Sequence, residues 1–150
     1  MMNFTHLDEN YKAKMVDVSG KKKQLRIAKA QGKIILQPET VERIVSNNII
    51  KGNVLAVAKV AAIQGGKKTC DLIPMCHNVF ISQIDIAFEI EDNGIICTSK
   101  AVAVDVTGIE MEALTAVSVA LLTIYDMCKA VDKQMSFSHI HLLEKTKQDL

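Results

Sequence analysis

Alternation of apolar and polar residues marks the start of the regular part of the chain. Leu25 and Ile27 occupy alternate positions within residues 24–30, a period of two that is typical of a half-buried strand. Residues 33–36 extend this pattern beyond Gly32. The first strand of a sheet is therefore predicted here.

Further strands are predicted as a hairpin and a final strand. Residues 81–90 alternate Ile or Phe on one face with Gln, Asp and Glu on the other. Asp-Asn-Gly at residues 92–94 is a turn signal, and residues 95–104 form the returning strand. Residues 136–143 are predicted to form the last strand.

Two shorter helices are predicted between the first strand and the hairpin. Pro38 suits a first helical turn and opens a helix that continues to Val45. Asn53 is a good N-cap for a second helix over about residues 54–64. The two glycines at residues 65–66 are expected to end this second helix.

The longest helix is predicted over residues 110–130. It is acidic at its start and carries Lys129 and Lys133 at its end, which suits the helix dipole. The element order is strand, two helices, hairpin, long helix and strand, and an antiparallel sheet with helices packed on one face accommodates it. Because no repeat or linker interrupts the chain, residues 1–150 are predicted to form one α+β domain.

Composition and charge restrict the partners of this domain. Hydrophobic residues make up 49% of the chain and charged residues 23%, an ordinary globular balance. With four Phe, two Tyr and no Trp, aliphatic side chains and Met must fill the core. A net charge of +1 attracts no polyanion at long range, so we expect no nucleic-acid partner, and anion binding has to come from locally clustered Lys and Arg.

The four cysteines are expected to be reduced. They could form two disulfides, but residues 1–10 have no apolar signal-peptide core, which favours a cytosolic protein. The apolar runs are too short to span a bilayer, so no membrane association is expected. Cys70, Cys76 and the adjacent His77 loosely suggest zinc, although their spacing fits no common ligand pattern.

A lysine pair follows the two glycines. Residues 65–69, Gly-Gly-Lys-Lys-Thr, fail the phosphate-loop motif because Ala61 stands at its first glycine position and because a helix precedes them. Lys67 and Lys68 could still meet phosphates as point charges on a flexible segment. The alternative is an ordinary solvated helix C-terminus, where lysines are common.

Acidic positions on the long helix are candidates for catalysis. Asp126 and Lys129 are three residues apart and therefore adjacent on one face, where a carboxylate beside an ammonium can hold both groups charged or exchange a proton. Glu112 precedes Asp126 by 126 − 112 = 14 residues, so the two share a face at an axial separation of roughly 21 Å. Either they serve separate ends of a long substrate, or each completes a different site with residues from a neighbouring chain.

Basic and imidazole side chains are further candidates. Arg26 lies in the first predicted strand, and its guanidinium could grip a phosphate bidentately. His77 follows an apolar segment, so it is either a satisfied buried residue or a group that orients or protonates a substrate. His139 and His141 share a strand face and could form a metal pair.

Several of these segments together resemble one known family, the cyclic pyranopterin monophosphate synthases (molybdenum cofactor biosynthesis protein C). The matches lie in the same order and spacing over about residues 5–145, and the two longest are highly specific. The matching segments are residues 15–19 (MVDVS), 51–54 (KGNV), 67–69 (KKT), 71–77 (DLIPMCH), 107–116 (TGIEMEALTA) and 122–131 (LTIYDMCKAV). Asn78 and Val106 depart from the family pattern, which usually has proline and lysine there.

The resemblance implies a ferredoxin-like fold assembled as a homohexamer, a trimer of dimers, with active sites at subunit interfaces. This agrees with the element order and favours the two-chain explanation for Glu112 and Asp126. The implied activity is that of a cytoplasmic lyase of molybdenum cofactor (molybdopterin) biosynthesis. Its substrate would be the cyclised nucleotide (8S)-3′,8-cyclo-7,8-dihydroguanosine 5′-triphosphate, and its products cyclic pyranopterin monophosphate, a pterin, and diphosphate.

The resemblance also implies roles for individual residues. The implied catalytic residues are Asp126 and Lys129 as a pair, with Lys51, His77, Glu110, Glu112 and Lys145. The implied substrate contacts are Met75, Cys76, His77, Met111 and Glu112. We expect Asp17, Arg26, Lys67 and Lys68 at the triphosphate. No metal site or cofactor is implied, although magnesium could accompany the triphosphate.

One alternative from a different class stays open at this point. Ferredoxin-like domains often bind small ligands and oligomerise without catalysing a reaction. The chain could therefore be a catalytically impaired paralogue that acts as a regulatory module.

Overall fold

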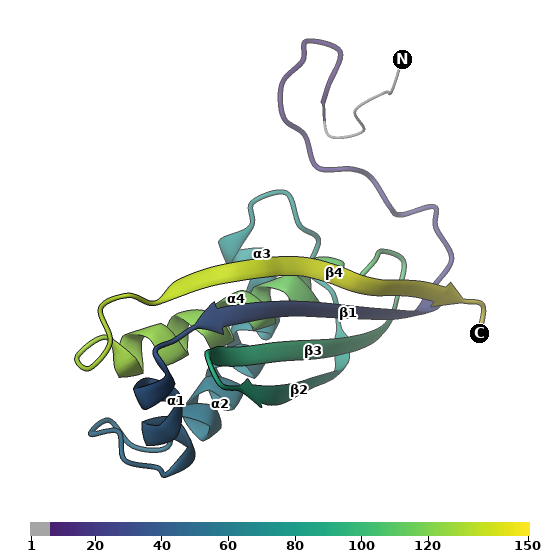
Figure 1. The fold of residues 1–150 in the computed structure, drawn as a ribbon. Coiled ribbons are helices and arrows are strands. Elements are labelled where there is room, and N and C mark those ends of the chain that lie inside the picture. Colours follow the sequence, from purple (N-terminus) through teal and green to yellow (C-terminus); the bar gives the residue numbers. More distant parts are fainter. Residues whose placement is uncertain (1–6) are drawn as a thin grey trace.

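The structure, a computed structural model, describes residues 7–150, which begin with an extended segment leading into a four-stranded sheet (Figure 1). Residues 1–6 of the segment considered above for a signal peptide lie outside this range. The elements in chain order are β1 (Gln24–Ile35), α1 (Pro38–Val45), α2 (Val54–Lys67), α3 (Thr69–Leu72), β2 (Ile81–Glu91), β3 (Gly94–Asp105), α4 (Glu110–Cys128) and β4 (Ser136–Gln148).

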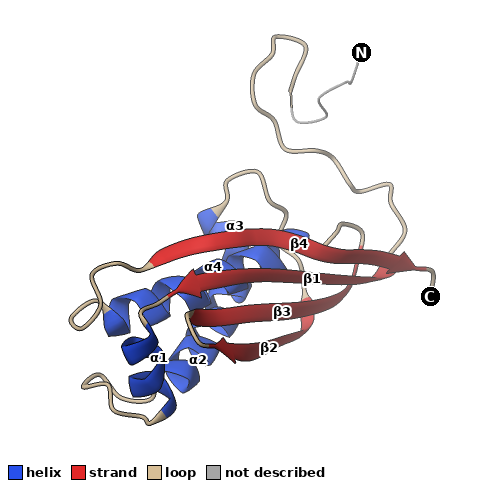
Figure 2. Cartoon of the chain, in the orientation of Figure 1, coloured by secondary structure: helices blue, strands red, loops and turns tan. Residues whose placement is uncertain are grey.

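The sheet has the strand order β2-β3-β1-β4, and each neighbouring pair is antiparallel. Helices connect β1 to β2 and β3 to β4, which with this strand order gives the ferredoxin-like arrangement. The helices cover one face of the sheet and leave the other face open (Figure 2). The predicted α+β fold class is therefore confirmed.

Small residues in the central strands allow the helices to approach the sheet closely. Ala28 in β1 and Ala101 in β3 are fully buried, and α4 contacts both strands. An added Cβ at Gly32 would lie 2.9 Å from side-chain carbons of both Ile140 and Val117. Gly32 thus leaves β1 continuous, as predicted, and makes room for α4 and β4.

The last strand is longer than predicted. It was expected to end at Leu143 and instead continues to Gln148, which pairs with Leu25 of β1. Apolar alternation could not reveal the added residues because β4 is an edge strand whose side chains are almost all exposed. Without a buried face, no periodic pattern is required.

Helix α2 continues through the two glycines that were expected to end it. Gly65 and Gly66 are buried inside the helix, which ends at Lys67. A Cβ at Gly65 would lie 2.6 Å from Val119 Cγ2, so glycine at this position lets α2 and α4 pack closely. The predicted helix end was wrong because glycine serves close approach as well as termination. The single-turn helix α3, which begins at Thr69, was not predicted.

Helix α4 carries candidate site residues at both of its ends. It begins at Glu110 as predicted and ends at Cys128 rather than Ala130. Within residues 7–150 it is the one helix long and apolar enough, by length and composition alone, to cross a membrane. The expectation that every apolar run is too short to span a bilayer therefore does not hold for α4 by length and composition alone. The packing of α4 against β1, β3 and α2 accounts for its apolar character as that of a core helix.

The N-terminal segment, residues 7–23, has no helix or strand and extends away from the sheet (Figure 1). Between residues 9 and 23, only Val16 and Val18 are half-buried. Val16 makes a defined contact with the rest of the chain, because its main-chain oxygen lies 2.6 Å from His77 Nε2.

Candidate active site

The residues predicted for the site gather mainly at opposite ends of α4. The cavity at its N-terminal end, of about 440 Å³, is called here the Glu112 pocket. The loop between α3 and β2, the loop between β3 and α4, and the first turn of α4 provide its lining: Ile73, Met75, Cys76, His77, Val79, Thr107, Gly108, Glu110, Met111 and Glu112. Segments distant in the sequence thus bring six predicted residues together.

Glu112 is the buried acid of this pocket. Only 4% of the surface of Glu112 is exposed to solvent. Burial is the main cause that raises the pKa of its carboxyl, and the nearby carboxylates of Glu110 and Asp105 raise it further. A carboxyl shifted in this direction exchanges protons closer to neutral pH, which suits it to acid–base chemistry.

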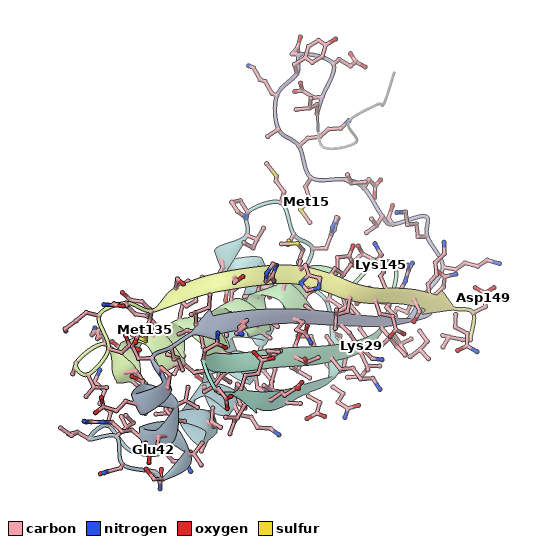
Figure 3. All side chains as sticks on the ribbon, in the orientation of Figure 1. Met15, Lys29, Glu42, Met135, Lys145 and Asp149 are labelled. Carbon is pink, nitrogen blue, oxygen red and sulfur yellow. The ribbon has the colours of Figure 1, made fainter. Side chains whose placement is uncertain are left out.

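Glu110 and Lys145 form an ion pair beside Glu112. The Lys145 ammonium, on β4 (Figure 3), lies 2.6 Å from Glu110 Oε1. Lys145 therefore belongs with the N-terminal end of α4 and not with Asp126 and Lys129. The other oxygen, Oε2, is buried and has no hydrogen-bond partner within residues 7–150. A Cβ at Gly108 would lie 2.0 Å from this oxygen, so a side chain there would displace the carboxylate.

The loop side of the Glu112 pocket carries a thiol and an imidazole. Burial, and next the charge of Glu112, raise the pKa of the Cys76 thiol, so it stays a neutral thiol rather than a reactive thiolate. His77 Nε2 lies 2.6 Å from the main-chain oxygen of Val16 in the N-terminal segment. His77 is thus held by a hydrogen bond while it also lines the cavity.

The second cavity, called here the Asp126 pocket, lies at the C-terminal end of α4 and also measures about 440 Å³. It is lined by Lys51, Tyr125, Asp126, Lys129, Ala130, Asp132 and Lys133. Lys51 comes from the loop before α2, so tertiary contact brings it to α4. Three lysines around one cavity provide the local positive charge that the composition required.

Asp126 lies between two ammonium groups in this pocket. Its Oδ1 is 2.7 Å from Lys129 Nζ and its Oδ2 is 2.8 Å from Lys51 Nζ. The hydrogen bonds from Lys129 and then Lys51 lower the pKa of Asp126 to about 2, and the Asp126 carboxylate raises the pKa of Lys129. Of the two alternatives for this pair, the structure supports the one in which both groups are charged at rest.

The two pockets are separate within one chain. Among the described residues, 7–150, none lines both of them. Glu112 is buried, whereas the Asp126 side chain is 55% exposed. The separation predicted from helix geometry is therefore maintained in the fold, and one small reacting centre cannot touch both acids of the same chain.

The lysine pair at the end of α2, Lys67 and Lys68, lies outside both pockets. Lys67 ends α2 and lines a smaller cavity, of about 320 Å³, that includes Asn78 and Asp105. The Lys68 ammonium lies 3.9 Å from the Asp71 carboxylate. The flexible glycine segment proposed for these lysines was wrong because both glycines are helical. The arrangement fits the alternative of a solvated helix C-terminus.

Two other residues expected at the triphosphate lie near the Glu112 pocket. Arg26 Nη2 lies 3.3 Å from the main-chain oxygen of Val106, and Arg26 Nε is buried without a partner among the described residues. Val106 directly precedes the pocket residue Thr107. Asp17 accepts a hydrogen bond of 2.9 Å from the Ser19 amide, which is the main cause that lowers the pKa of its carboxyl. The charge of His77 also lowers the pKa of Asp17, but by less.

The residues considered for zinc do not assemble. Within residues 7–150, no three side chains of His, Cys, Asp and Glu come together in a group that could hold a metal ion. The sheet register shifts near His139, which has a φ of 53°. His141 Nδ1 contacts the main-chain oxygen of His139. The simple alternation that placed both imidazoles on one strand face therefore does not hold there.

Sequence reasoning missed part of the lining of the Asp126 pocket. Asp132, which lies beyond the end of α4, is buried and lines this pocket. Its carboxylate accepts hydrogen bonds of 2.9 Å from the backbone amides of Gln37 and Gln134. Tyr125 lines the pocket with its ring 5.7 Å from that of Phe137. Its position directly before Asp126 was the available signal.

A further cavity lies away from the predicted chemistry. It measures about 620 Å³ and is lined mainly by apolar residues of α1, α2 and β2, such as Ile44, Leu55 and Phe88. Lys59 is the one charged side chain that the described part of the chain places in its lining. It lacks the acids and bases that characterise the other two pockets.

The fold and the pockets define a class of protein: a ferredoxin-like α+β domain with acid–base groups in two cavities of small-molecule size. A comparison with protein families makes the assignment more specific. The model of the MoaC family matches residues 15–148. The chain belongs to this family.

Individual relatives agree with the family match. The chain is 56% identical to the cyclic pyranopterin monophosphate synthase of Desulfitobacterium hafniense, over 97% of this chain and 90% of that protein. It is 54% identical to the protein of the same name from Peptoclostridium acidaminophilum, over 97% of this chain and 92% of that protein. It is also 54% identical to a molybdenum cofactor biosynthesis bifunctional protein of Chlorobaculum tepidum and spans 46% of that longer protein.

Proposed function

We propose that this chain is a lyase of molybdenum cofactor biosynthesis. It converts (8S)-3′,8-cyclo-7,8-dihydroguanosine 5′-triphosphate to cyclic pyranopterin monophosphate and diphosphate. Family membership and the names of relatives that are 54–56% identical support this activity. The observation that carries the proposal is the Asp126 carboxylate held between the ammonium groups of Lys51 and Lys129.

In this proposal the Asp126 pocket handles the phosphate chemistry. Lys51, Lys129 and Lys133 supply positive charge where negative charge develops as a cyclic phosphate closes and diphosphate leaves. Because the Asp126 carboxylate raises its pKa, Lys129 rests as an ammonium, and its fixed positive charge stabilises the negative charge that develops on the phosphate. Asp126 stays ionised and fixes the two ammonium groups in position.

The Glu112 pocket would hold the ring system whose imidazole portion is opened and rebuilt. These steps need acids and bases that exchange protons near neutral pH. Glu112 meets this requirement through its raised pKa, and the His77 imidazole lines the same pocket as a second group that can carry a proton. Glu110 and Lys145, as an ion pair, would orient the ring or relay protons to it. Arg26, whose Nε is buried without a partner among the described residues, would meet the far end of the triphosphate.

We further propose that a complete site takes one pocket from each of two chains, within a homohexamer that is a trimer of dimers. The two pockets lie at opposite ends of α4, which supports a site shared between chains. Apolar side chains are exposed on both long helices, including Val57 and Val60 on α2 and Leu122 on α4. Helices that are apolar on all sides are usually buried, and another subunit would cover these surfaces.

The proposed enzyme acts in the cytoplasm on a small nucleotide-derived substrate. It needs no resident cofactor, and magnesium would enter only with the triphosphate. Protein that has been treated with a chelator and then freed from it should be fully active. Adding magnesium should change the activity only through its binding to the triphosphate substrate. Stoichiometric metal retained after purification and required for turnover would contradict it.

The decisive experiment is turnover of the authentic cyclised dihydro-GTP by the purified protein. We expect one diphosphate released for each cyclic pyranopterin monophosphate formed. Asp126→Asn serves as the inactive control. Tight binding of the substrate without diphosphate release would contradict the proposal and favour the regulatory module instead.

A further inference from the structure

The N-terminal segment reaches the Glu112 pocket at one defined contact. Residues 15–19, called here the strap, pass the loop between α3 and β2, and Met15 lies at this approach (Figure 3). Val16 and Val18 are half-buried while Met15, Asp17 and Ser19 are exposed, so the two valines face the body of the protein. The Asp17 carboxylate accepts a hydrogen bond from the Ser19 amide, which stabilises the turn after Asp17.

The contact decides which nitrogen of His77 carries the proton. A main-chain carbonyl oxygen only accepts hydrogen bonds, so the 2.6 Å contact between Val16 O and His77 Nε2 requires a proton on Nε2. In the neutral imidazole, Nδ1 is then the unprotonated nitrogen. Within residues 7–150, Nδ1 of His77 makes no hydrogen bond. The ring lines the Glu112 pocket with this nitrogen as its one site for taking up a proton.

The strap also supplies charge that suits this role. The interaction between Asp17 and His77 is attractive when the ring is protonated, as its effect on Asp17 indicates. A carboxylate near the ring would stabilise the imidazolium that forms once Nδ1 has taken a proton. A base held by one group and stabilised as a cation by another is an arrangement that recurs in acid–base catalysis.

We infer that the strap is a positioning element of the Glu112 pocket: the Val16 carbonyl holds His77 in the Nε2-protonated tautomer and leaves Nδ1 as the proton acceptor for substrate. The tautomer assignment stands on the contact itself. Only the statement that Nδ1 accepts a proton from substrate rests on the proposed function. The two parts therefore fail in different experiments.

Nitrogen NMR of the imidazole rings tests the tautomer directly. The chain has four histidines, and a His77→Gln variant identifies the His77 signals. In a pH series, we expect the neutral form of the ring to show Nε2 protonated, with a slowly exchanging proton, and Nδ1 unprotonated. A protonated Nδ1, or signals averaged between the two tautomers in the full chain, would overturn the inference.

Two N-terminal truncations separate the strap from the rest of the segment. A chain that begins at Met15 keeps the Val16 contact, whereas a chain that begins at Gly20 lacks it. No buried core residue precedes Ala28 within the described residues, so both variants should keep the fold, which melting temperature checks. We expect the first to give the NMR pattern of the full chain and the second to lose the slow Nε2 proton and show averaged nitrogens.

Turnover then separates positioning from binding. If His77 acts through Nδ1, the Gly20 variant should lose about tenfold or more in kcat with a smaller change in KM, and the Met15 variant should lose neither. An unchanged His77 spectrum in the Gly20 variant would overturn the positioning role whatever the activity. The expected spectra together with no turnover in the full chain would instead count against the proposed function.

Discussion

The two ends of α4 hold their acids in opposite ways. Glu112 is buried, and burial raises the pKa of its carboxyl. Asp126 is exposed between two ammonium groups, and they lower its pKa to about 2. The same helix thus presents one carboxyl suited to exchanging a proton and one that stays an anion. The surroundings of each acid, and not its residue type, decide which role it can take.

The largest effect is expected from removing the charge at the Asp126 end. Asp126→Asn keeps the side-chain shape but leaves the ammonium groups of Lys51 and Lys129 without their counter-ion. We expect kcat to fall by about a hundredfold or more, because these groups then lose their position and charge balance. Diphosphate release measures this. The melting temperature should change little, because Asp126 is exposed.

A surface ion pair of similar exposure provides the matched control. Glu144 lies 2.7 Å from Lys29 and is 44% exposed. Glu144→Gln should leave kcat and KM unchanged within about twofold, since exposed ion pairs contribute little. Equal losses in both variants would show that general surface charge, and not the Asp126 pocket, supports turnover.

The second prediction asks whether the two ends of α4 work together across chains. Asp126→Ala and Glu112→Ala should each be inactive as pure proteins. If one site takes its two pockets from different chains, a mixed assembly contains a site with both pockets intact, and part of the activity should return. Co-expression with two affinity tags isolates the mixed assemblies for assay.

The control combines two changes in one pocket. In mixed assemblies of Asp126→Ala with Lys129→Ala, every shared site keeps one damaged Asp126 pocket, so no activity should return. Recovery in neither mixture, with both chains proven present, would contradict the shared site. Recovery in both mixtures would contradict it as well.

The third prediction concerns the packing that holds α4 in place. At Gly65, an added Cβ would lie 2.6 Å from Cγ2 and 2.8 Å from Cβ of Val119, a stiff branched side chain. Gly65→Ala should therefore lower the free energy of unfolding by about 1–3 kcal/mol, despite the better helix propensity of Ala. Gly20→Ala is the control, because nothing lies within 4 Å of a Cβ there. Denaturant unfolding compares them, and equal stability would mean that α2 and α4 can separate freely.

The smallest effect is expected from the buried acid. The pKa of Glu112 is raised above the ordinary value of 4.5, so the folded state binds more protons than the unfolded state between 4.5 and the raised pKa. Stability contributed by Glu112 is thus present below 4.5 and lost as pH rises through the folded pKa. Glu112→Gln, which stays neutral, should raise the melting temperature at neutral pH and lose this advantage below 4.5. A constant difference at all pH values would contradict the shift.

The order of the main elements could be predicted because each leaves a local signal. The alternation in residues 81–90, the turn at residues 92–94 and the cap at Asn53 all correspond to elements of the structure. The predicted element ends were wrong where a residue type can serve two structural purposes or where the sequence carries no periodic pattern. Gly65 and Gly66 serve close packing instead of a helix end, and the exposed strand after Leu143 has no buried face to produce a pattern.

The contacts of the candidate site also fall into those that local spacing predicts and those that it does not. The spacing of Asp126 and Lys129 predicted their contact, because residues three apart in a helix are always neighbours. The approach of Lys51 to Asp126, of Lys145 to Glu110 and of Val16 to His77 joins positions 75, 35 and 61 residues apart. No local rule predicts such contacts.

By itself, the sequence determined the α+β element order, the family and the acid–ammonium pair on α4, since these depend on periodicities and motifs within short segments. Only the tertiary structure decided that Glu112 is buried and that Asp126 lies between two lysines. The physical reason is that burial and charge environment depend on which distant segments pack together, and a pKa follows from that environment.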